Sequence, residues 1–353
     1  MAPESRSAVA LAILSAVLFG ASTPFAKLLV GDGLDPWLLA GLLYLGSGLG
    51  LSVIQGLRRL RGRASEAPLR RADLPWLALV AFAGGAIGPA LLMIGLATTP
   101  ASTAALLLNV EGLATLLIAW IVFHESVDRR LLIGAGAILA GAVLLSYQGG
   151  PGGIGVGALA IFGACLAWGI DNNLTRKISA ADPVAIALVK GLVAGAVNLT
   201  LALLSGAHLP PAGTIAFAGI VGFLGYGVSL VLFVLALRGL GAARTGAYFA
   251  TAPFLGAVLA VVMFHEPVTA TLVAAGLLMA LGLYLHLSED HAHDHVHAPM
   301  EHEHRHVHDA HHQHAHGPDD PAGEPHVHAH RHARLAHRHA HYPDLHHRHD
   351  HEA

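Results

Sequence analysis

The stretch from residue 101 to residue 145 occurs twice in this chain, and this duplication restricts the folds open to it. Each copy contains an apolar run, a short polar joint and a second apolar run. A shift of 141 residues places the Phe-His-Glu triplet at 123–125 on the one at 264–266, and Gly112 on Pro253. The register holds over about fifty residues, which indicates an internal repeat rather than a chance motif.

Long apolar runs account for most of the chain. Hydrophobic residues make up 54% of the sequence and charged residues only 12%, which is typical of a polytopic membrane protein. A helix of about 20 residues crosses roughly 30 Å of hydrocarbon. We therefore predict an all-α polytopic membrane protein with ten transmembrane helices. Their approximate limits are 8–30, 36–56, 75–97, 101–123, 130–147, 155–176, 183–205, 213–237, 242–264 and 269–287.

The repeat divides the chain into two halves and a tail. The first five-span repeat covers residues 1–147, a turn-rich linker covers 148–154, and the second five-span repeat covers 155–287. A polar segment rich in histidine covers 288–353. Because each half has an odd number of spans, the two halves are expected to lie in opposite orientations in the membrane.

Positive charge gathers in alternate loops, which predicts the orientation of the whole chain. Lys and Arg residues lie at 58–71, 129–130, 176–177 and 238–244, while the intervening loops carry almost none. Positive charge accumulates in cytoplasmic loops. We therefore expect a multi-pass protein of the cell (inner) membrane with both termini, and so the tail, in the cytoplasm.

These features together resemble the EamA family of the drug/metabolite transporter superfamily over residues 8–287. The matching features are the two five-span halves, the small-residue start Phe19-Gly20-Ala21-Ser22, and an apolar helix in each half that ends in an acid, Glu125 or Glu266. The resemblance implies alternating-access transport, usually outward, of amino acids, other metabolites or drugs. One departure is Gly112, which stands where the family usually has a proline.

Charged residues within the apolar runs are the first candidates for the transport pathway, because a charge near the centre of a bilayer costs several kcal/mol. Glu111 lies at the middle of the fourth run, Asp171 deep in the sixth and Lys190 within the seventh. Lys27 lies near the end of the first run, where a lysine can also reach the interface. An ion-paired helix contact without any substrate is the alternative for each of them.

The helix interruptions at Glu111-Gly112 and Ala252-Pro253 are a second indication of a pathway. Inverted-repeat transporters place such interruptions at corresponding positions near the membrane midplane. Glu111 adds a charge in one half only, which favours it as an acceptor for a proton or a substrate amine. The complete set of predicted pathway residues is Glu111, Asp171, Lys190, Asn109, Gly112, Pro253, Lys27, Asn172 and Asn173.

The dipeptides His124-Glu125 and His265-Glu266 are interpreted as helix-end residues at the membrane interface. Neighbouring residues on a helix point about 100° apart, so neither dipeptide suits a metal site by itself. Inverted halves would also place the two dipeptides at opposite faces of the membrane.

The tail contains 23 of the 27 histidines, most of them in His-x-His alternation. Residues two apart share one side of an extended chain, and imidazole is a ligand for zinc, nickel, cobalt and copper. We expect a tail that binds these ions and is disordered without them, although a pH-responsive tail without metal is an alternative. The predicted ligands are His291, His293, His295, His297, His302, His304, His306, His308, His311, His312, His314, His316, His326, His328, His330, His332, His337, His339 and His341.

Two functions from different classes fit the sequence. The first, which we favour, is a secondary transporter that exports small metabolites, amino acids or drugs and carries a metal-binding tail. The second is a divalent-metal transporter for zinc, nickel or cobalt, and a metal store anchored by its spans is a weaker third. No nucleophile-base pair or phosphate loop suggests an enzyme. We expect no required cofactor and no nucleic-acid partner, and the sequence leaves a homodimer open.

Overall fold

A computed structural model describes the membrane body and parts of the tail. It covers residues 3–60, 69–123, 129–147, 154–175, 178, 181–240 and 242–287. In the tail it covers the backbone of residues 292–297, 300–306, 326–332 and 335–340. The dipeptide His124-Glu125, most of the linker and several predicted tail ligands lie outside the described residues. Those tail ligands are His291, His308, His311, His312, His314, His316 and His341.

The first half consists of helices that form five spans. Their bounds are α1 (Pro3–Gly31), α2 (Pro36–Leu60), η1 (Arg71–Asp73), α3 (Leu74–Val80), η2 (Ala81–Ile87), α4 (Gly88–Thr98), α5 (Ala101–Leu107), α6 (Val110–Phe123) and α7 (Arg129–Ser146). The segments η1 to α4 form the third span and α5 with α6 forms the fourth. The second span ends at Leu60 rather than at residue 56, because Arg58 and Arg59 continue the helix beyond the apolar run.

The second half repeats this order. Its helices are α8 (Val156–Thr175), α9 (Pro183–Leu204), α10 (Ala212–Gly222), η4 (Phe223–Val228), α11 (Ser229–Leu240), α12 (Ala242–Phe249), α13 (Ala252–Phe264) and α14 (Ala270–Leu287). Here α10, η4 and α11 form one span, and α12 with α13 forms another.

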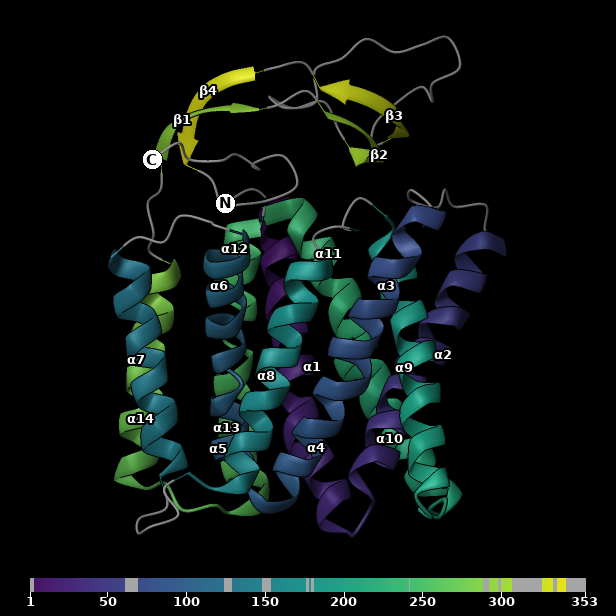
Figure 1. Ribbon diagram of the computed structural model, residues 1–353, viewed down its shortest axis with the longest axis vertical. Coiled ribbons are helices and arrows are strands. Elements are labelled where there is room, and N and C mark those ends of the chain that lie inside the picture. The colour runs from purple at the N-terminus through teal and green to yellow at the C-terminus, as the bar shows by residue number, and fades with distance from the viewer. Residues whose placement is uncertain are drawn as a thin grey trace.

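The predicted ten-span all-α body is therefore confirmed for the described residues, and Figure 1 shows its helices side by side. By length and composition, seven of the described helical segments can cross a membrane, and two shorter apolar helices follow near the end of the body. Helix α8 completes the set. Its lower hydropathy results from the polar triplet at 171–173 near its end.

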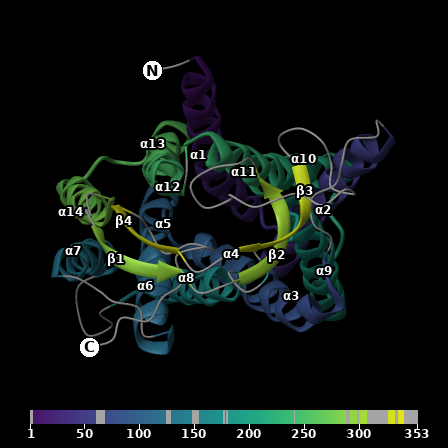
Figure 2. The ribbon, with the colours of Figure 1, turned by 90° about the horizontal axis from the view of Figure 1, so that it is seen from above.

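Helix packing follows the inverted repeat. The second spans of the two halves, α2 and α9, pack against each other, as do the last spans, α7 and α14. The contact of α4 with α8 has its counterpart in the contact of α11 with α1, and the contact of α6 with α8 matches that of α13 with α1. Figure 2 shows α7 and α14 as a pair at the edge of the bundle. The contacts of α8 with α4 and α6 thus recur in the other half, and the α2–α9 and α7–α14 contacts each join equivalent spans, as expected for two inverted halves.

Helix interruptions also recur at equivalent positions. The third and eighth spans each contain a π-helical segment, η2 and η4. The fourth span is interrupted between Leu107 and Val110, and the ninth between Phe249 and Ala252. Pro253 explains the second interruption because proline has no backbone N–H to continue the helix. In the first half, the Nδ2 of Asn109 donates to the Leu106 carbonyl at 2.8 Å and so competes with the helical bonds.

Glycines allow close contact between the second and seventh spans. A Cβ added at Gly48 would lie 2.6 Å from the backbone nitrogen of Leu192, and one at Gly191 would lie 2.8 Å from the backbone nitrogen of Gly48. A Cβ at Gly195 would lie 2.6 Å from the nitrogen of Leu45. Such distances leave no room for a side chain, so the backbones of α2 and α9 touch directly, as small residues permit in membrane helices.

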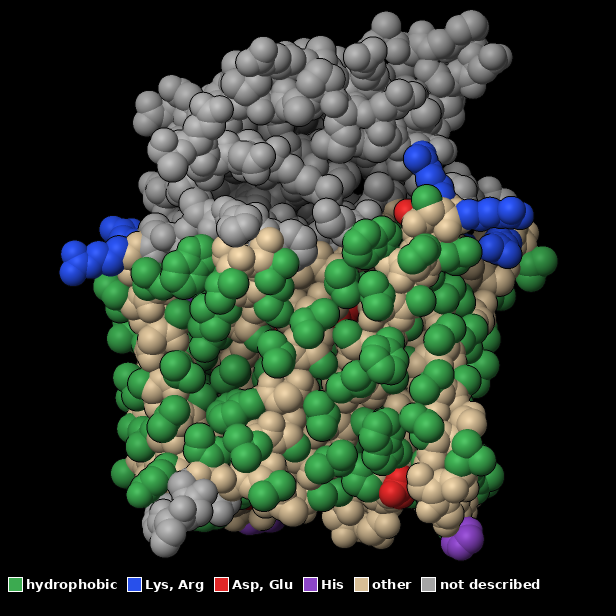
Figure 3. All heavy atoms as spheres, in the orientation of Figure 1, with side chains coloured by type: hydrophobic (Ala, Val, Ile, Leu, Met, Phe, Trp, Pro, Cys, Tyr) green, Lys and Arg blue, Asp and Glu red, His purple; other side chains and the backbone are tan. Residues whose placement is uncertain are grey.

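The surface of the body has the distribution expected for a membrane protein. Hydrophobic side chains cover the flank, and the Lys and Arg side chains on the face shown lie at the upper end (Figure 3). Helix α1 begins and α14 ends at this same end (Figure 1). Both ends of the body therefore share the basic face.

The backbone described in the tail forms four short strands. They are β1 (Ala292–His297), β2 (Met300–His306), β3 (His326–His332) and β4 (Leu335–Ala340), paired antiparallel as β1 with β4 and β2 with β3. The sequence predicted no strands there. The predicted disorder of the tail without metal stays a prediction.

Candidate functional site

A cavity of about 380 Å³ lies between the two halves of the body. Spans of both halves contribute to it, among them α1, α2 and α6 from the first and α8, α9, η4, α11 and α12 from the second. The lining residues are Phe19, Tyr44, Ser47, Glu111, Trp168, Asp171, Asn172, Ala187, Lys190, Gly191, Gly225, Tyr226, Ser229, Leu230, Phe233 and Phe249. The three charged residues within it, Glu111, Asp171 and Lys190, are all predicted pathway residues.

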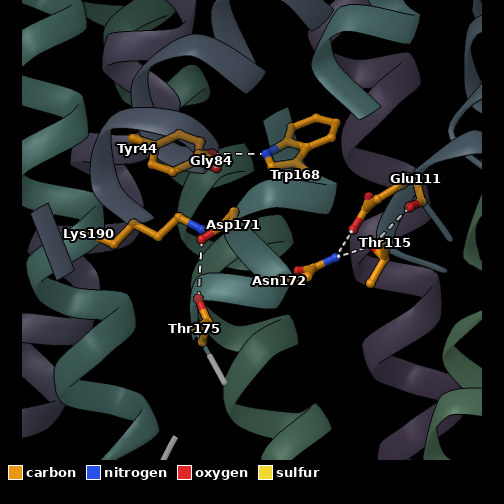
Figure 4. A network of polar contacts seen from close by, with 9 residues as sticks. All are labelled: Tyr44, Gly84, Glu111, Thr115, Trp168, Asp171, Asn172, Thr175 and Lys190. Atoms are coloured by element: carbon orange, nitrogen blue, oxygen red, sulfur yellow. Dashed lines mark hydrogen bonds and ion pairs between the residues drawn. The ribbon is translucent and has the colours of Figure 1, made fainter. Parts of the chain in front are cut away.

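Asp171 and Lys190 form an ion pair across α8 and α9. The Nζ of Lys190 donates to Oδ2 of Asp171, while the hydroxyl of Thr175 donates to Oδ1 at 3.2 Å (Figure 4). The Asp171 side chain is 5% exposed and the Lys190 side chain 20% exposed. Both charges therefore have a partner, which offsets part of the cost of holding them in the membrane interior.

Glu111 has a different environment, although it lies in the same cavity. Its Oε1 accepts a hydrogen bond from the Nδ2 of Asn172 at 3.0 Å, and the same amide also donates to the hydroxyl of Thr115 at 3.2 Å (Figure 4). Among the residues that the structure describes, no cation pairs with this carboxylate. Among the described residues, the site thus combines an acid held in an ion pair, Asp171, with an acid that has only a neutral hydrogen-bond donor, Glu111.

The π-helical segment η2 provides a backbone acceptor that fixes two aromatic side chains. The carbonyl of Gly84 accepts hydrogen bonds from the hydroxyl of Tyr44 at 3.1 Å and from the indole Nε1 of Trp168 at 2.9 Å (Figure 4). A π-helix displaces backbone groups from the regular ladder and often occurs at functional sites. Both rings line the cavity with their polar groups already occupied.

The remaining aromatic residues of the cavity form a connected group. The ring of Phe249 lies 5.2 Å from that of Phe19 and 4.9 Å from that of Phe233, between centroids. Tyr226 joins the group through an edge-to-face contact with Phe19 at 6.0 Å and a contact with Tyr44 at 5.4 Å. These separations fall in the range of favourable aromatic pairs. The cavity is therefore lined by charged residues from α6, α8 and α9 and by rings mainly from α1, η4, α11 and α12.

Five of the predicted pathway residues lie outside this cavity. Lys27 donates to the carbonyl of Leu96 near the end of α1. Asn109 lies buried in the interruption of the fourth span. Gly112 is exposed on α6, and Pro253 lies in the first turn of α13.

Asn173, the fifth of these residues, has a structural role in the contact between α8 and α6. Its Nδ2 donates to the carbonyl of Thr115 at 3.1 Å and to that of Gly169 at 2.8 Å. Asn172, its neighbour, does line the cavity. A part in transport for the five outlying residues stays a prediction.

The aromatic lining was not identified from the sequence, although the repeat contained a signal for it. Phe19 and Trp168 occupy equivalent positions in the first spans of the two halves, and both line the cavity. Gly84 and Gly225 correspond through the 141-residue shift, and both lie in π-helical segments at the cavity. Correspondence between the halves was therefore a signal for these residues, although Gly112 and Pro253 correspond in the same way and lie outside the cavity.

The side chains that the structure describes contain no metal-binding cluster. No group of three or more His, Cys, Asp or Glu side chains there is arranged to hold a metal ion. The tail side chains lie outside that description. Its backbone register does place histidines opposite each other, as in His302 with His330 and His304 with His328.

Comparisons with known proteins agree with this architecture. The model of the family described as the EamA-like transporter family matches residues 6–147 and 155–288. An uncharacterized transporter of Methanothermobacter thermautotrophicus is 30% identical over 210 residues, which are 56% of this chain and 61% of that relative. A protein of known crystal structure superposes with a TM-score of 0.58 at 22% identity, over 79% of this chain and 95% of its own. At that identity, the structural likeness concerns the fold alone.

Proposed function

This chain belongs to the EamA-like transporter family, and from that membership we propose that it is a secondary transporter that exports small metabolites, amino acids or drugs by alternating access. The observation that carries the proposal is the cavity between the inverted halves, with Glu111, Asp171 and Lys190 in its lining. Ionisable residues inside a membrane protein are costly and commonly mark a transport route.

The helix interruptions support the same mechanism. Each half has one span with a π-helical segment and one span broken near its middle, and these irregular segments lie next to the cavity. Broken helices at the interface of inverted repeats supply backbone groups to a central site while the halves rock against each other. In this chain the helix contacts of α8 correspond to those of α1, and the π-helical segment η2 corresponds to η4. Such matched pairs are consistent with a rocking motion of the halves.

Transport is tested in inside-out vesicles from cells that express the full chain. A panel of labelled amino acids, aromatic amines and zinc would be offered under a proton gradient to the wild type, Glu111→Gln and Asp32→Asn. Asp32 is an exposed acid outside the cavity, so its replacement makes the same change in charge without touching the site. Uptake that Glu111→Gln abolishes and Asp32→Asn leaves intact supports the proposal. Equal uptake by Glu111→Gln between pH 6 and 8 contradicts it, and uptake of zinc alone favours the metal-transport alternative.

The orientation is part of the proposal. The basic residues in the last turn of α2 and the first turn of α7 flank the loops that the charge rule assigns to the cytoplasm. Single cysteines at Ser65 and Gly152, in a Cys165→Ser background, test this assignment with an impermeant thiol reagent. Labelling of Gly152 from outside and of Ser65 only after permeabilisation is expected, and labelling of both from one side contradicts it.

We also propose that the tail binds transition-metal ions in the cytoplasm and acts as a sensor or buffer beside the transport route. The backbone register supports this, since β2 and β3 pair His302 with His330, His304 with His328 and His306 with His326. Directly opposite residues of an antiparallel pair lie about 5 Å apart, which suits two ligands of one ion. At about four ligands per site, 23 histidines would bind at most five or six ions of zinc or nickel.

Comparison of the full chain with a variant that lacks residues 288–353 tests this role. Zinc titration should show several ions bound by the full chain and few by the truncated one. Transport in vesicles should persist after truncation if the tail is a sensor or buffer. Loss of transport at every zinc concentration would instead place the tail in the transport machinery.

A further inference from the structure

The charges around the cavity do not cancel. Asp171 is compensated by Lys190, and its second oxygen is occupied by Thr175. Glu111 receives one hydrogen bond from a neutral amide, Asn172, and has no cationic partner among the described residues. An ionised Glu111 therefore leaves the cavity with one uncompensated negative charge, in a region where such a charge is strongly unfavourable.

The aromatic group gives a second, independent constraint on what fills the cavity. Phe19, Phe233 and Phe249 carry no polar atoms in their side chains, and the polar groups of Tyr44 and Trp168 are already bonded to Gly84. Around Phe19, Phe233 and Phe249 a ligand therefore meets aromatic surface rather than hydrogen-bond donors, while Ser47 and Tyr226 contribute hydroxyls elsewhere in the lining. The faces of aromatic rings attract cations, and their area suits an apolar body.

We propose that the cavity binds a small organic monocation, an amine or quaternary ammonium with an aromatic or apolar body. Its positive charge neutralises Glu111, and its body packs against the rings of Phe19, Phe233 and Phe249. This assignment rests on the proposed transport function and names the substrate class for the same site. Among the metabolites, amino acids and drugs proposed above, it selects cationic amines and excludes zwitterions and anions.

The geometry disfavours the competing ligand charges. A zwitterionic amino acid needs a cation for its carboxylate, but Lys190 is already held by Asp171. An anion would add to the charge of Glu111. A divalent metal ion such as Mg²⁺ or Ca²⁺ requires about six or more oxygen ligands, whereas the lining has two carboxylates, Asp171 in an ion pair and Glu111, and is otherwise largely aromatic and apolar.

The cavity volume limits the size of the ligand. Pockets for small molecules range from about 300 to 1,000 Å³, and about 380 Å³ lies near the lower end of that range. A single-ring amine fits this description better than a large polycyclic drug.

Binding to the purified full-length protein in detergent tests the inference with a series of probes that share one ring. The probes are 2-phenylethylamine and benzyltrimethylammonium as cations, phenylalanine as zwitterion and 3-phenylpropionate as anion, measured by calorimetry at pH 7.5. Both cations should bind at least about tenfold more tightly than the zwitterion and the anion, as expected for one desolvated ion pair. Tighter binding of phenylalanine or of 3-phenylpropionate overturns the proposal without any need for a variant.

Two variants separate the contributions of charge and rings. Glu111→Gln should weaken both cations at least about tenfold, while the matched Asp32→Asn leaves them unchanged. Phe249→Leu should weaken benzyltrimethylammonium several-fold with Glu111 still in place. Cation affinity that is unchanged in a folded Glu111→Gln overturns the assignment.

The outcome can be separated from that of the proposed function. Vesicles that transport phenylalanine and exclude the amines would preserve the transporter and refute the substrate class. Amines that bind tightly to the protein yet are never transported, together with no transport of any other compound, would preserve the cation site and refute the transporter.

Discussion

Glu266 connects the two halves at the end of the body away from the basic face, and its replacement by Gln gives the most direct test of the structure. Its Oε1 accepts a hydrogen bond from the backbone nitrogen of Ala101 at 2.7 Å. Its Oε2 accepts from the backbone nitrogen of Ser102 at 3.0 Å and from the hydroxyl of the same serine. The carboxylate thus caps the start of α5, where Pro100 offers no side-chain cap.

The expected effect follows from these bonds. The first N–H groups of a helix have no partner inside it, and a negative charge at this end is favoured by the helix dipole. Glu266→Gln removes the charge and replaces one accepting oxygen by an NH₂ group, so the bonds made to that oxygen are lost. A hydrogen bond to a charged group contributes about 1.5–3 kcal/mol. Because Glu266 is only half-buried, we expect a total loss of about 2 kcal/mol, or roughly thirtyfold in the equilibrium for breaking this contact.

Hydrogen exchange measures this equilibrium at the amides of Ala101 and Ser102. The peptide that covers the start of α5 should exchange roughly thirtyfold faster in Glu266→Gln than in the wild type. The start of α9 provides an internal control, because its cap, Asp182, precedes it directly in the chain and does not involve Glu266. The Asp182 side chain accepts a hydrogen bond from the Val184 nitrogen at 2.9 Å. Protection there should not change.

Two results would refute the reasoning. Unchanged exchange at Ala101 and Ser102 would mean that the carboxylate does not hold the start of α5. An equal increase in exchange at the start of α9 would mean that the variant destabilises the whole protein, so the effect could not be assigned to the contact between Glu266 and α5. Glu125, the repeat counterpart of Glu266, lies outside the described residues.

Further predictions concern the backbone, the packing and the tail. His265 has a left-handed conformation with φ of 52°, so His265→Val should lower thermal stability by about 1–2 kcal/mol while His265→Gly should not, as measured by thermal melting in detergent. A Cβ at Gly46 would lie 2.6 Å from the Cα of Gly219, so Gly46→Ala should cost about 1–3 kcal/mol. Gly56→Ala, in the same helix with nothing within 4 Å of the added Cβ, should be neutral or stabilising in the same melts. Zinc binding by the full chain should be strong at pH 7.5 and weak at pH 5.5 in calorimetry, because protons displace the metal as histidine titrates near about 6.5. Equal binding at both values would exclude histidine as the main ligand.

The sequence by itself determined the architecture and four of the residues that line the cavity, Glu111, Asp171, Asn172 and Lys190. Span number and inversion follow from hydropathy and from the duplicated pattern, since a bilayer imposes one length and one polarity on every helix that crosses it. Glu111, Asp171 and Lys190 could be identified because a charge among apolar residues is conspicuous when its burial is costly. The acid at Glu266 was also noted, but only as a residue at a helix end.

Only the tertiary structure decided how these residues are combined. The pairing of Lys190 with Asp171 rather than with Glu111 depends on how α6, α8 and α9 pack, whereas in the sequence either acid could be its partner. The rings of Phe19 and Phe249 are ordinary apolar residues until α1 and α12 are brought together. Glu266 became a bond between the halves because inversion places the start of α5 beside the turn before α14. Hydrophobicity selects which segments enter the membrane, whereas the close contacts between helices select which of their side chains meet.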